Sequence, residues 1–290
     1  MSRITLRSPA KINLCLSVLG KRPDGYHEVE MLMQMVGLYD EVSVSLGGTR
    51  ITISCDDAVP SGEENTVWKA AAEMLKAARS HVGLTIELRK NIPVAAGLAG
   101  GSGNAAAVLA ALNRLLNTGF GPARLAEIGM RVGMDVPFFF YGPTAVARGR
   151  GEILTSLAPA PRFWVLLVNP GFETSTAWVY KNINLRLTKK VDCNKIARLT
   201  VRNIVEGLHN DLEAVTASAH PVISRIEEAL LAEGALGARM SGSGPTVFGI
   251  FETEAACRTA AANLSNEGWR LFPAETLTES PFTEYIYTME

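Results

Sequence analysis

The sequence predicts an α+β protein with two domains, on three observations. Predicted strands and helices come in groups, without the strict strand–helix alternation of a doubly wound parallel sheet. The length of 290 residues suits one large domain or two moderate ones. A proline-rich segment at residues 159–161 precedes a new apolar strand pattern. We therefore expect a first domain over residues 1–158 and a second over residues 159–290.

The first half begins with strands. Apolar residues alternate with polar or small ones over residues 12–18, which is the two-residue period of a strand, and residues 21–25 suit a turn. A helix is expected over residues 65–78, capped by Asn65 or Thr66. A strongly helical run over residues 104–116 follows a glycine-rich loop. Further strands are predicted at residues 31–36, 42–46, 51–54 and 84–88.

The second half has fewer clear patterns. Residues 237–245 are rich in glycine and suit a tight turn between two strands. Helices are predicted at residues 221–232 and 254–266, and strands at residues 163–168, 246–251 and 284–288.

Composition and charge exclude several classes of function. The net charge is −1, so the chain lacks the basic surface of a nucleic-acid binder, and we expect no nucleic-acid partner. No apolar stretch approaches the roughly 20 residues of a membrane span, so we expect no membrane partner. The N-terminus shows no signal peptide pattern, which favours a cytoplasmic protein. The four cysteines are far apart, without a zinc-binding pattern, and are expected to be free thiols. They are Cys15, Cys55, Cys193 and Cys257.

The glycine-rich loop, residues 92–104, is the main functional candidate. Glycine has no Cβ, so the backbone can turn sharply and approach a ligand closely. The unpaired N–H groups at the start of the following helix favour an anion. That helix is apolar on nearly every face, which indicates a buried, rigid platform, and Ser102 can add a hydroxyl to a phosphate or a magnesium ion. The alternative is a flexible loop beside a helix of the core.

Two better-known phosphate loops fit this segment poorly. A P-loop needs a lysine and a serine or threonine after its last glycine, but Asn104 and Ala105 follow Gly103. Residues 101–106 fit the G-x-G-x-x-A form of a dinucleotide-binding fingerprint. That fingerprint follows a strand directly, however, and here about a dozen residues separate it from the preceding strand pattern.

Three further segments carry side chains suited to chemistry. Lys11 stands at the start of the first strand and can reach a phosphate or a hydroxyl, or extend along an edge strand into water. Tyr26 and His27 follow a turn and suit a flat base, or are exposed rings of a hairpin. Asp135 precedes a very apolar run and suits a proton acceptor; with Pro137 it also suits a helix N-cap.

Together and in this order, these segments resemble the GHMP kinase superfamily. The resemblance extends from residue 8, through the glycine-rich loop and Asp135, to the turn at residues 241–244 and the end of the chain. It implies two α+β domains with the active site in the cleft between them, and ATP as the phosphate donor with Mg²⁺ at its phosphates. Within the superfamily, residues 9–14 and 20–28 are similar to members whose small-molecule substrate is an alcohol that carries cytidine diphosphate. We expect a monomer or weak dimer.

The resemblance also assigns the catalytic and ATP-binding positions. Asp135 would be the catalytic base and Lys11 its charged partner. No residue is assigned as a direct magnesium ligand. The positions expected to bind ATP are Pro93, Ala95, Gly97, Leu98, Ala99, Gly100, Gly101, Ser102, Gly103 and Asn104.

Five other positions match substrate-binding residues of these relatives. Tyr26 and His27 would hold the cytosine, and Tyr180 would lie on the opposite face of the base. Thr176 matches a polar residue of the cleft, and Asn13 matches a residue close to the acceptor alcohol.

The glycine-rich loop departs from the family pattern at two positions. In the usual run Gly-Leu-Gly-Gly-Gly-Ser-Ser-Asn, Ala99 replaces a glycine and Gly103 replaces the second serine. Alanine tolerates a positive φ poorly, and the missing hydroxyl is expected to remove a phosphate or magnesium contact, which weakens ATP binding. Two alternatives stay open. One is another small-alcohol kinase of the superfamily, such as a homoserine kinase, and the other is a catalytically silent ligand sensor.

Overall fold

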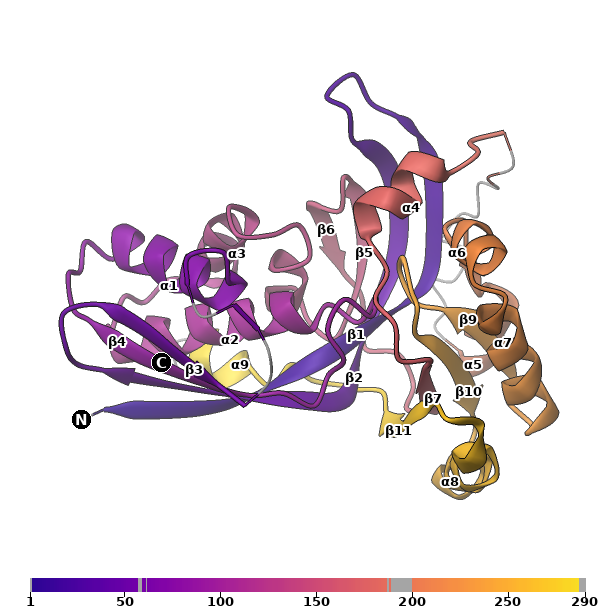
Figure 1. Ribbon diagram of the computed structural model, residues 1–290. Coiled ribbons are helices and arrows are strands. Elements are labelled where there is room, and N and C mark those ends of the chain that lie inside the picture. Colours follow the sequence, from indigo (N-terminus) through magenta and orange to yellow (C-terminus); the bar gives the residue numbers. More distant parts are fainter. Residues whose placement is uncertain (1, 57–58, 61, 187, 189–199, 287–290) are drawn as a thin grey trace.

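The computed structural model describes residues 2–56, 59–60, 62–186, 188 and 200–286 (Figure 1). The chain forms two β-sheets with helices on their outer faces, which confirms the predicted α+β class. Apolar residues of both sheets meet in a shared core that includes Ile12 and Leu32 from the first sheet and Val165 and Phe248 from the second. In the described part of the chain, no helix is both long enough and apolar enough to span a membrane.

The first sheet is built around two long antiparallel strands. Strands β1 and β2 pair along most of their length, with irregularities between Pro9 and Ala10, between Asn13 and Cys15, and between Val18 and Gly20. The strand order is β3-β4-β2-β1-β8, and β5 also pairs with β2 and with β6. The strands are β1 (Arg3–Lys21), β2 (His27–Leu46), β3 (Ile51–Cys55), β4 (Leu84–Arg89), β5 (Thr144–Gly149), β6 (Ile153–Ser156) and β8 (His209–Asn210).

The outer face of the first sheet is covered by helices. Helix α2 (Gly100–Leu115) is buried along most of its length, as its apolar sequence predicts, and lies between the sheet and helices α1 (Thr66–Ala77) and α3 (Pro122–Met130) (Figure 1). Helix α1 is capped by Asn65, whose side chain accepts a hydrogen bond from the backbone N–H of Val67, as predicted. A short 3₁₀ helix, Pro137–Phe140, adds phenylalanine side chains to the same core.

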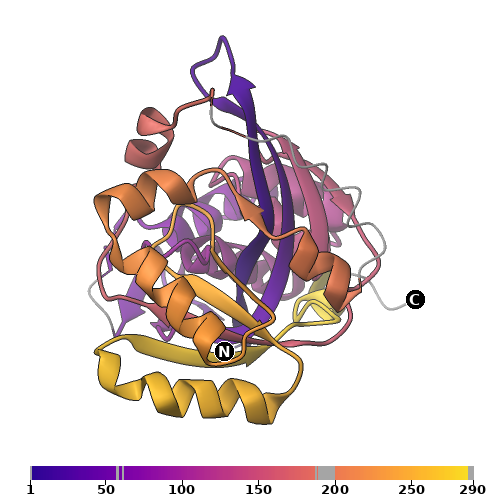
Figure 2. The ribbon, with the colours of Figure 1, turned by 90° about the vertical axis from the view of Figure 1, so that its right-hand side faces the viewer.

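The second sheet is smaller and antiparallel, with the order β11-β7-β10-β9. Its strands are β7 (Trp164–Asn169), β9 (Gly237–Met240), β10 (Val247–Phe251) and β11 (Arg270–Glu275). Helices α7 (Val222–Ala232) and α8 (Glu254–Asn263) pack on it, and they are the orange and yellow-orange helices in the foreground of Figure 2. The remaining helices of the second half are α4 (Thr176–Asn182), α5 (Val201–Glu206), α6 (Glu213–Ala219) and α9 (Thr283–Ile286).

Several predicted boundaries need correction. The strands predicted at residues 31–36 and 42–46 are one strand, β2, because pairing with β1 continues between them at Tyr39. The helix predicted to start at Asn104 starts at Gly100. The helix predicted over residues 254–266 ends as α8 at Asn263 and continues as a 3₁₀ helix to Glu267.

The strand predicted at residues 284–288 is wrong. The described part of this segment is helix α9, and residues 287 and 288 lie outside the described residues. Phe282 and Ile286 are both buried in the core that also holds α2. Residues four positions apart lie on one face both in a helix and in a strand, so this spacing does not distinguish the two structures. Packing against the core decides in favour of the helix.

The predicted domain boundary at residue 158 lies between β6 and β7 and stays a prediction. After it, the chain returns to the first half of the molecule at several points, among them a bridge between Thr276 and Val36 of β2. Strand β8 pairs in parallel with β1, and the Asn113 side chain of α2 donates a hydrogen bond to the carbonyl of Tyr285 in α9.

Candidate active site

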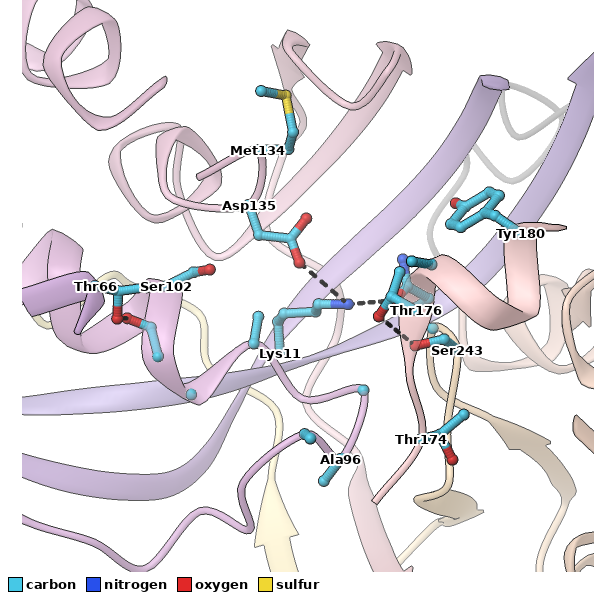
Figure 3. Close-up of a pocket in the computed structure, with 18 of the residues that line it drawn as sticks. Lys11, Thr66, Ala96, Ser102, Met134, Asp135, Thr174, Thr176, Tyr180 and Ser243 are labelled. Atoms are coloured by element: carbon cyan, nitrogen blue, oxygen red, sulfur yellow. Dashed lines mark hydrogen bonds and ion pairs between the residues drawn. The ribbon is translucent and has the colours of Figure 1, made fainter. Parts of the chain in front are cut away.

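A cleft of about 1260 Å³ runs between the two halves of the molecule. Its walls come from β1 and β2, the glycine-rich loop, the loop that holds Asp135, helix α4 and the turn at residues 242–243. Figure 3 shows these side chains converging, with Ser102 and Thr66 on one side of Lys11 and Tyr180 on the other. All of the predicted catalytic and substrate-binding residues line this cleft: Lys11, Asn13, Tyr26, His27, Asp135, Thr176 and Tyr180.

The glycine-rich loop is held in place from two directions. The carbonyl of Leu98 accepts a hydrogen bond from the backbone N–H of Lys11, at 3.0 Å. The carbonyl of Gly97 accepts one from Ser241 Oγ, at 2.9 Å, and Ser241 Oγ in turn accepts one from the N–H of Asn13, at 3.2 Å. The glycine turn that begins at Ser241 therefore joins the loop to β1.

Gly97 shows why this contact needs glycine. Its φ is +76°, and an added Cβ would lie 2.1 Å from the carbonyl oxygen of Ser241. The backbone of the second half thus passes directly against the loop, and a larger residue at this position would push the two apart.

Helix α2 begins within the glycine run, so its first turn faces the cleft. Gly100, Gly101, Ser102 and Asn104 all line the cleft, as do Pro93, Ala95, Gly97 and Ala99. The N-cap residue Ala99 has φ +52°, the left-handed conformation that its replacement of a glycine makes costly. Unpaired N–H groups at this end favour an anion. Leu98 is the exception among the predicted ATP-binding positions with side chains, because it is buried in the shared core.

Gly103 faces β1 and not the cleft. An added Cβ would lie 2.8 Å from Ser8 Oγ and 2.9 Å from the carbonyl oxygen of Pro9. The expectation that its missing hydroxyl costs a phosphate or magnesium contact is therefore wrong, because a side chain at this position would point into packed protein.

Lys11 and Asp135 form an ion pair on the floor of the cleft. Lys11 Nζ lies 3.8 Å from Asp135 Oδ2 (Figure 3). It also donates a hydrogen bond to Asn13 Oδ1 at 2.5 Å. Because Lys11 and Asn13 stand two residues apart on β1, their side chains leave the same face of the strand. Lys11 is buried, which excludes the alternative of an edge-strand lysine extended into water. Burial lowers the pKa of Lys11, and the charge of Asp135 partly opposes this shift.

Asp135 remains open to the cleft, with 34% of its side chain exposed. The alternative that it caps a helix is wrong, because the N-cap of the 3₁₀ helix is Val136 and no side chain caps it. The carboxylate is therefore available to a ligand in the cleft, while the lysine beside it is shielded from water.

Aromatic side chains form the opposite end of the cleft. The rings of His27 and Tyr180 stack with centroids 5.2 Å apart and an angle of 29° between planes. Tyr26 is half exposed, and the guanidinium of Arg150 lies 4.9 Å from the centre of its ring. Burial raises the pKa of the Tyr180 hydroxyl and lowers that of His27. The structure thus brings Tyr180 against His27 and places Tyr26 beside Arg150.

Thr176 stands at the start of α4 and joins the two halves of this wall. Its hydroxyl lies 2.8 Å from Ser243 Oγ, a hydrogen bond visible in Figure 3. Sequence reasoning missed Ser243 as a cleft residue, although it had noted the glycine-rich turn that contains it. It also missed four basic residues that line the cleft, since isolated basic residues give no pattern: Lys21, Lys90, Arg150 and Lys181.

The chemistry of the cleft fits a magnesium ion that is carried by phosphates. Among the described residues, no three histidine, cysteine, aspartate or glutamate side chains gather as a metal cage. Mg²⁺ usually binds through one or two protein oxygens together with substrate phosphates and water. Ser102 fits such a ligand, because it carries a hydroxyl in the first turn of α2 and lines the cleft.

Two family models match the chain. The GHMP kinases N terminal domain matches residues 65–143, and the GHMP kinases C terminal domain matches residues 195–270. The first match contains the glycine-rich loop and Asp135, and the second contains the turn at residues 241–244. With the two-sheet fold and its cleft, these matches define the class of the protein as a GHMP kinase.

Comparison with individual proteins narrows this class. The chain is 50% identical over 282 residues to 4-diphosphocytidyl-2-C-methyl-D-erythritol kinase of Pelobacter propionicus, which covers 96% of this chain and 100% of that protein. A crystal structure of 4-(cytidine 5'-diphospho)-2C-methyl-D-erythritol kinase is 33% identical, with a TM-score of 0.84 over 94% of this chain and 99% of that one. The chain belongs to the family of 4-diphosphocytidyl-2-C-methyl-D-erythritol kinases, and the resemblance seen in the sequence is confirmed.

A more distant structure shares the fold. Homoserine kinase from Cytophaga hutchinsonii is 21% identical, with a TM-score of 0.75 over 97% of this chain and 96% of that one.

Proposed function

We propose that this chain transfers the γ-phosphoryl group of ATP to the C2 hydroxyl of 4-diphosphocytidyl-2-C-methyl-D-erythritol. The reaction would serve isoprenoid precursor formation by the non-mevalonate route, in the cytoplasm. The observation that carries the proposal is the Lys11–Asp135 pair, which lies in the cleft between the start of α2 and the aromatic residues of the opposite end. Membership of the kinase family supports the same reaction.

In the proposed mechanism, positioning and charge supply most of the catalysis, as is general for phosphoryl transfer. Asp135 accepts the proton of the C2 hydroxyl as the new O–P bond forms. Lys11 places a buried positive charge beside that carboxylate and the reacting oxygen. The N–H groups at the start of α2 face the phosphates of ATP.

A magnesium ion, when bound, would neutralise charge on the phosphates. Ser102 is the residue best suited to contact it. The side chain of Asn13 keeps Lys11 in place through the hydrogen bond to its Nζ and lies where the methylerythritol end of the substrate would reach.

The base-binding end would hold the cytidine. Tyr26, His27 and Tyr180 supply aromatic surfaces there, and Thr176 supplies a hydroxyl. These residues separate the proposal from a homoserine kinase, whose small substrate carries no base. The assembly is proposed to be a monomer or weak dimer, which size-exclusion chromatography with light scattering would determine.

Release of ADP from the purified protein tests the reaction directly. The protein is incubated with ATP, magnesium and 4-diphosphocytidyl-2-C-methyl-D-erythritol, with homoserine and mevalonate in parallel. ADP release is expected only with the cytidine compound. The Asp135→Asn variant is expected to lose at least about a thousandfold in kcat while its ATP affinity changes little, because it keeps the shape but loses the proton acceptor.

Two results would refute this proposal. Turnover of homoserine or mevalonate at a comparable rate would reassign the substrate. Retained turnover in Asp135→Asn would show that another group accepts the proton.

A further inference from the structure

Asp40 is a buried carboxylate with no role in the proposed mechanism. It lies on β2, and its side chain is fully buried. Its Oδ1 accepts hydrogen bonds from the backbone N–H groups of Asn91 and Ile92, each at 2.8 Å. Its Oδ2 accepts one from Asn104 Nδ2 at 2.9 Å and forms an ion pair with Lys90 Nζ. One carboxylate thus binds four donors from two separate parts of the chain.

These donors lie at the two ends of the glycine-rich loop. Residues 90–92 lead into the loop, and Asn104 stands in the first turns of α2. The start of α2 rests on the same residues, because an added Cβ at Gly100 would lie 2.9 Å from Ile92 Cγ2 and 3.4 Å from Lys90 Nζ. Asp40 therefore fixes the position of the first turn of α2 relative to the segment that enters the loop.

We propose that Asp40 is a positioning residue for the phosphates of ATP, acting through Asn104 and residues 90–92 and not by contact with the nucleotide. This inference rests on the proposed function. A carboxylate has two acceptor oxygens and no donor, so it can hold donors on both sides, whereas an amide must turn an N–H₂ group toward one pair. Without Asp40 the N–H groups at the start of α2 lose their fixed aim at the phosphates.

Charge alone predicts the opposite result, which makes the inference easy to test. Asp40 carries a negative charge near the phosphate site, and its removal leaves Lys90 uncompensated. If only Coulomb attraction mattered, Asp40→Asn would bind ATP more tightly. If positioning dominates, the same variant binds ATP more weakly. The sign of the change in affinity distinguishes the two.

The experiment measures two ligands by calorimetry. The β,γ-imido analogue of ATP, with magnesium, reports on the phosphates, and adenosine reports on the base pocket without them. In Asp40→Asn the Kd of the analogue is expected to rise about tenfold, as for loss of a buried charge-assisted network. The Kd of adenosine is expected to stay within about twofold, because adenosine has no phosphates and does not use the site that the Asp40 network positions.

Glu30→Gln is the matched control. Glu30 lies on the same strand, its side chain is 7% exposed, and its Oε1 pairs with Arg148 Nε at 2.9 Å. It does not line the cleft. Like Asp40→Asn, the Glu30→Gln variant loses a buried charge and is expected to be less stable than the wild-type protein. Unlike Asp40→Asn, it is expected to leave the Kd of the analogue and the Kd of adenosine unchanged.

Asn104→Ala provides a second variant that keeps the Asp40–Lys90 pair and therefore does not leave a buried charge alone. This variant is expected to bind the analogue more weakly than the wild-type protein does, with the Kd of adenosine unchanged. If Asp40 acts through Asn104, the double variant binds the analogue no more weakly than Asp40→Asn alone, whereas independent effects would add.

Three results would overturn the inference. They are unchanged or tighter binding of the analogue by Asp40→Asn, equal weakening of analogue and adenosine, and additive effects in the double variant. None of these measurements requires turnover, so a failure of the proposed reaction with a wild-type protein that binds ATP would leave this test decisive.

Discussion

Lys11 shows how one residue is set apart by its surroundings. It is 4% exposed, with one carboxylate and one amide oxygen as partners. Removing an ammonium group from water disfavours its charged form, and the carboxylate of Asp135 only partly compensates. Burying a lysine in this way lowers the stability of the folded protein, and such a loss of stability is typical of functional residues.

The pH dependence of the reaction follows from the pKa of Lys11. Because that pKa is lowered, the ammonium loses its proton at a lower pH than an ordinary lysine does. If the charged form is needed, kcat is expected to fall as the pH rises, and to do so at a pH below the usual pKa of lysine. Lys11→Arg keeps its charge to higher pH, so its residual activity is expected to persist there. An identical alkaline limb in both proteins would show that another group controls it.

Tyr180 is expected to matter more for the alcohol substrate than for ATP. Tyr180→Ala removes the ring that stacks on His27, and a lost base-stacking contact typically costs about 1–3 kcal/mol. The KM of the cytidine substrate is therefore expected to rise about tenfold or more, and the KM of ATP to change little. Tyr180→Phe keeps the ring and is the control; Tyr26→Ala tests the second ring. Equal changes in both KM values would argue against stacking.

At the scale of elements, the phosphate loop depends on close contact between backbones. Helix α2 starts at Gly100, inside the glycine run, and both β1 and the Ser241 turn pack directly against that run. The two family departures have different consequences there. Ala99 takes a left-handed conformation at the N-cap, whereas Gly103 fits a space that Ser8 and Pro9 leave too small for a side chain.

Gly103→Ser, which restores the family residue, is expected to destabilise this protein. Its Cβ would meet a backbone carbonyl at 2.9 Å that cannot move without β1, and overpacking of this kind costs roughly 1–3 kcal/mol. Ala99→Gly in the same loop is the matched control, expected to stabilise by about 0.5 kcal/mol through release of the left-handed strain. Urea unfolding measures both. Tighter ATP binding by Gly103→Ser at unchanged stability would contradict this account.

At the scale of the whole molecule, the two halves are tied together at several points. Asn210 on β8 donates hydrogen bonds to the carbonyls of Met240 and Gly242, and Thr216 on α6 donates one to the carbonyl of Ser243. The turn that touches the glycine-rich loop is therefore supported from the second half, while β8 itself pairs with β1. Strand β8 therefore connects β1, on one wall of the cleft, with the glycine-rich turn on the other wall.

The far end of α2 offers a test of stability separate from activity. Asn113 donates hydrogen bonds to the carbonyls of Phe120 and Tyr285 and accepts one from the N–H of Phe120. Asn113→Ala is expected to lower the free energy of unfolding by about 2 kcal/mol because buried partners lose their bonds. Both KM values should stay unchanged, since about 14 Å of helix, at 1.5 Å per residue, separates it from Asn104, the nearest cleft residue on α2. A selective change in KM for ATP would show that α2 transmits the damage.

The sequence by itself determined the α+β class, the buried helix behind the glycine run and the residues that match the kinase family. These depend on local periodicity, on glycine's conformational freedom and on motif order, all of which are written in neighbouring residues. Lys11, Asp135, Tyr180 and the glycine loop could be named in this way, and the structure gathers them around one cleft.

Only the tertiary structure decided how these residues meet. The burial of Lys11, the pairing of His27 with Tyr180, the direction of Gly103 and the Asp40 network all join segments far apart in the chain. That residues 283–286 form helix α9 and not a strand was likewise decided by packing against α2. Such contacts depend on which surfaces the fold brings together, and no local pattern around Asp40 or Gly103 encodes their distant partners.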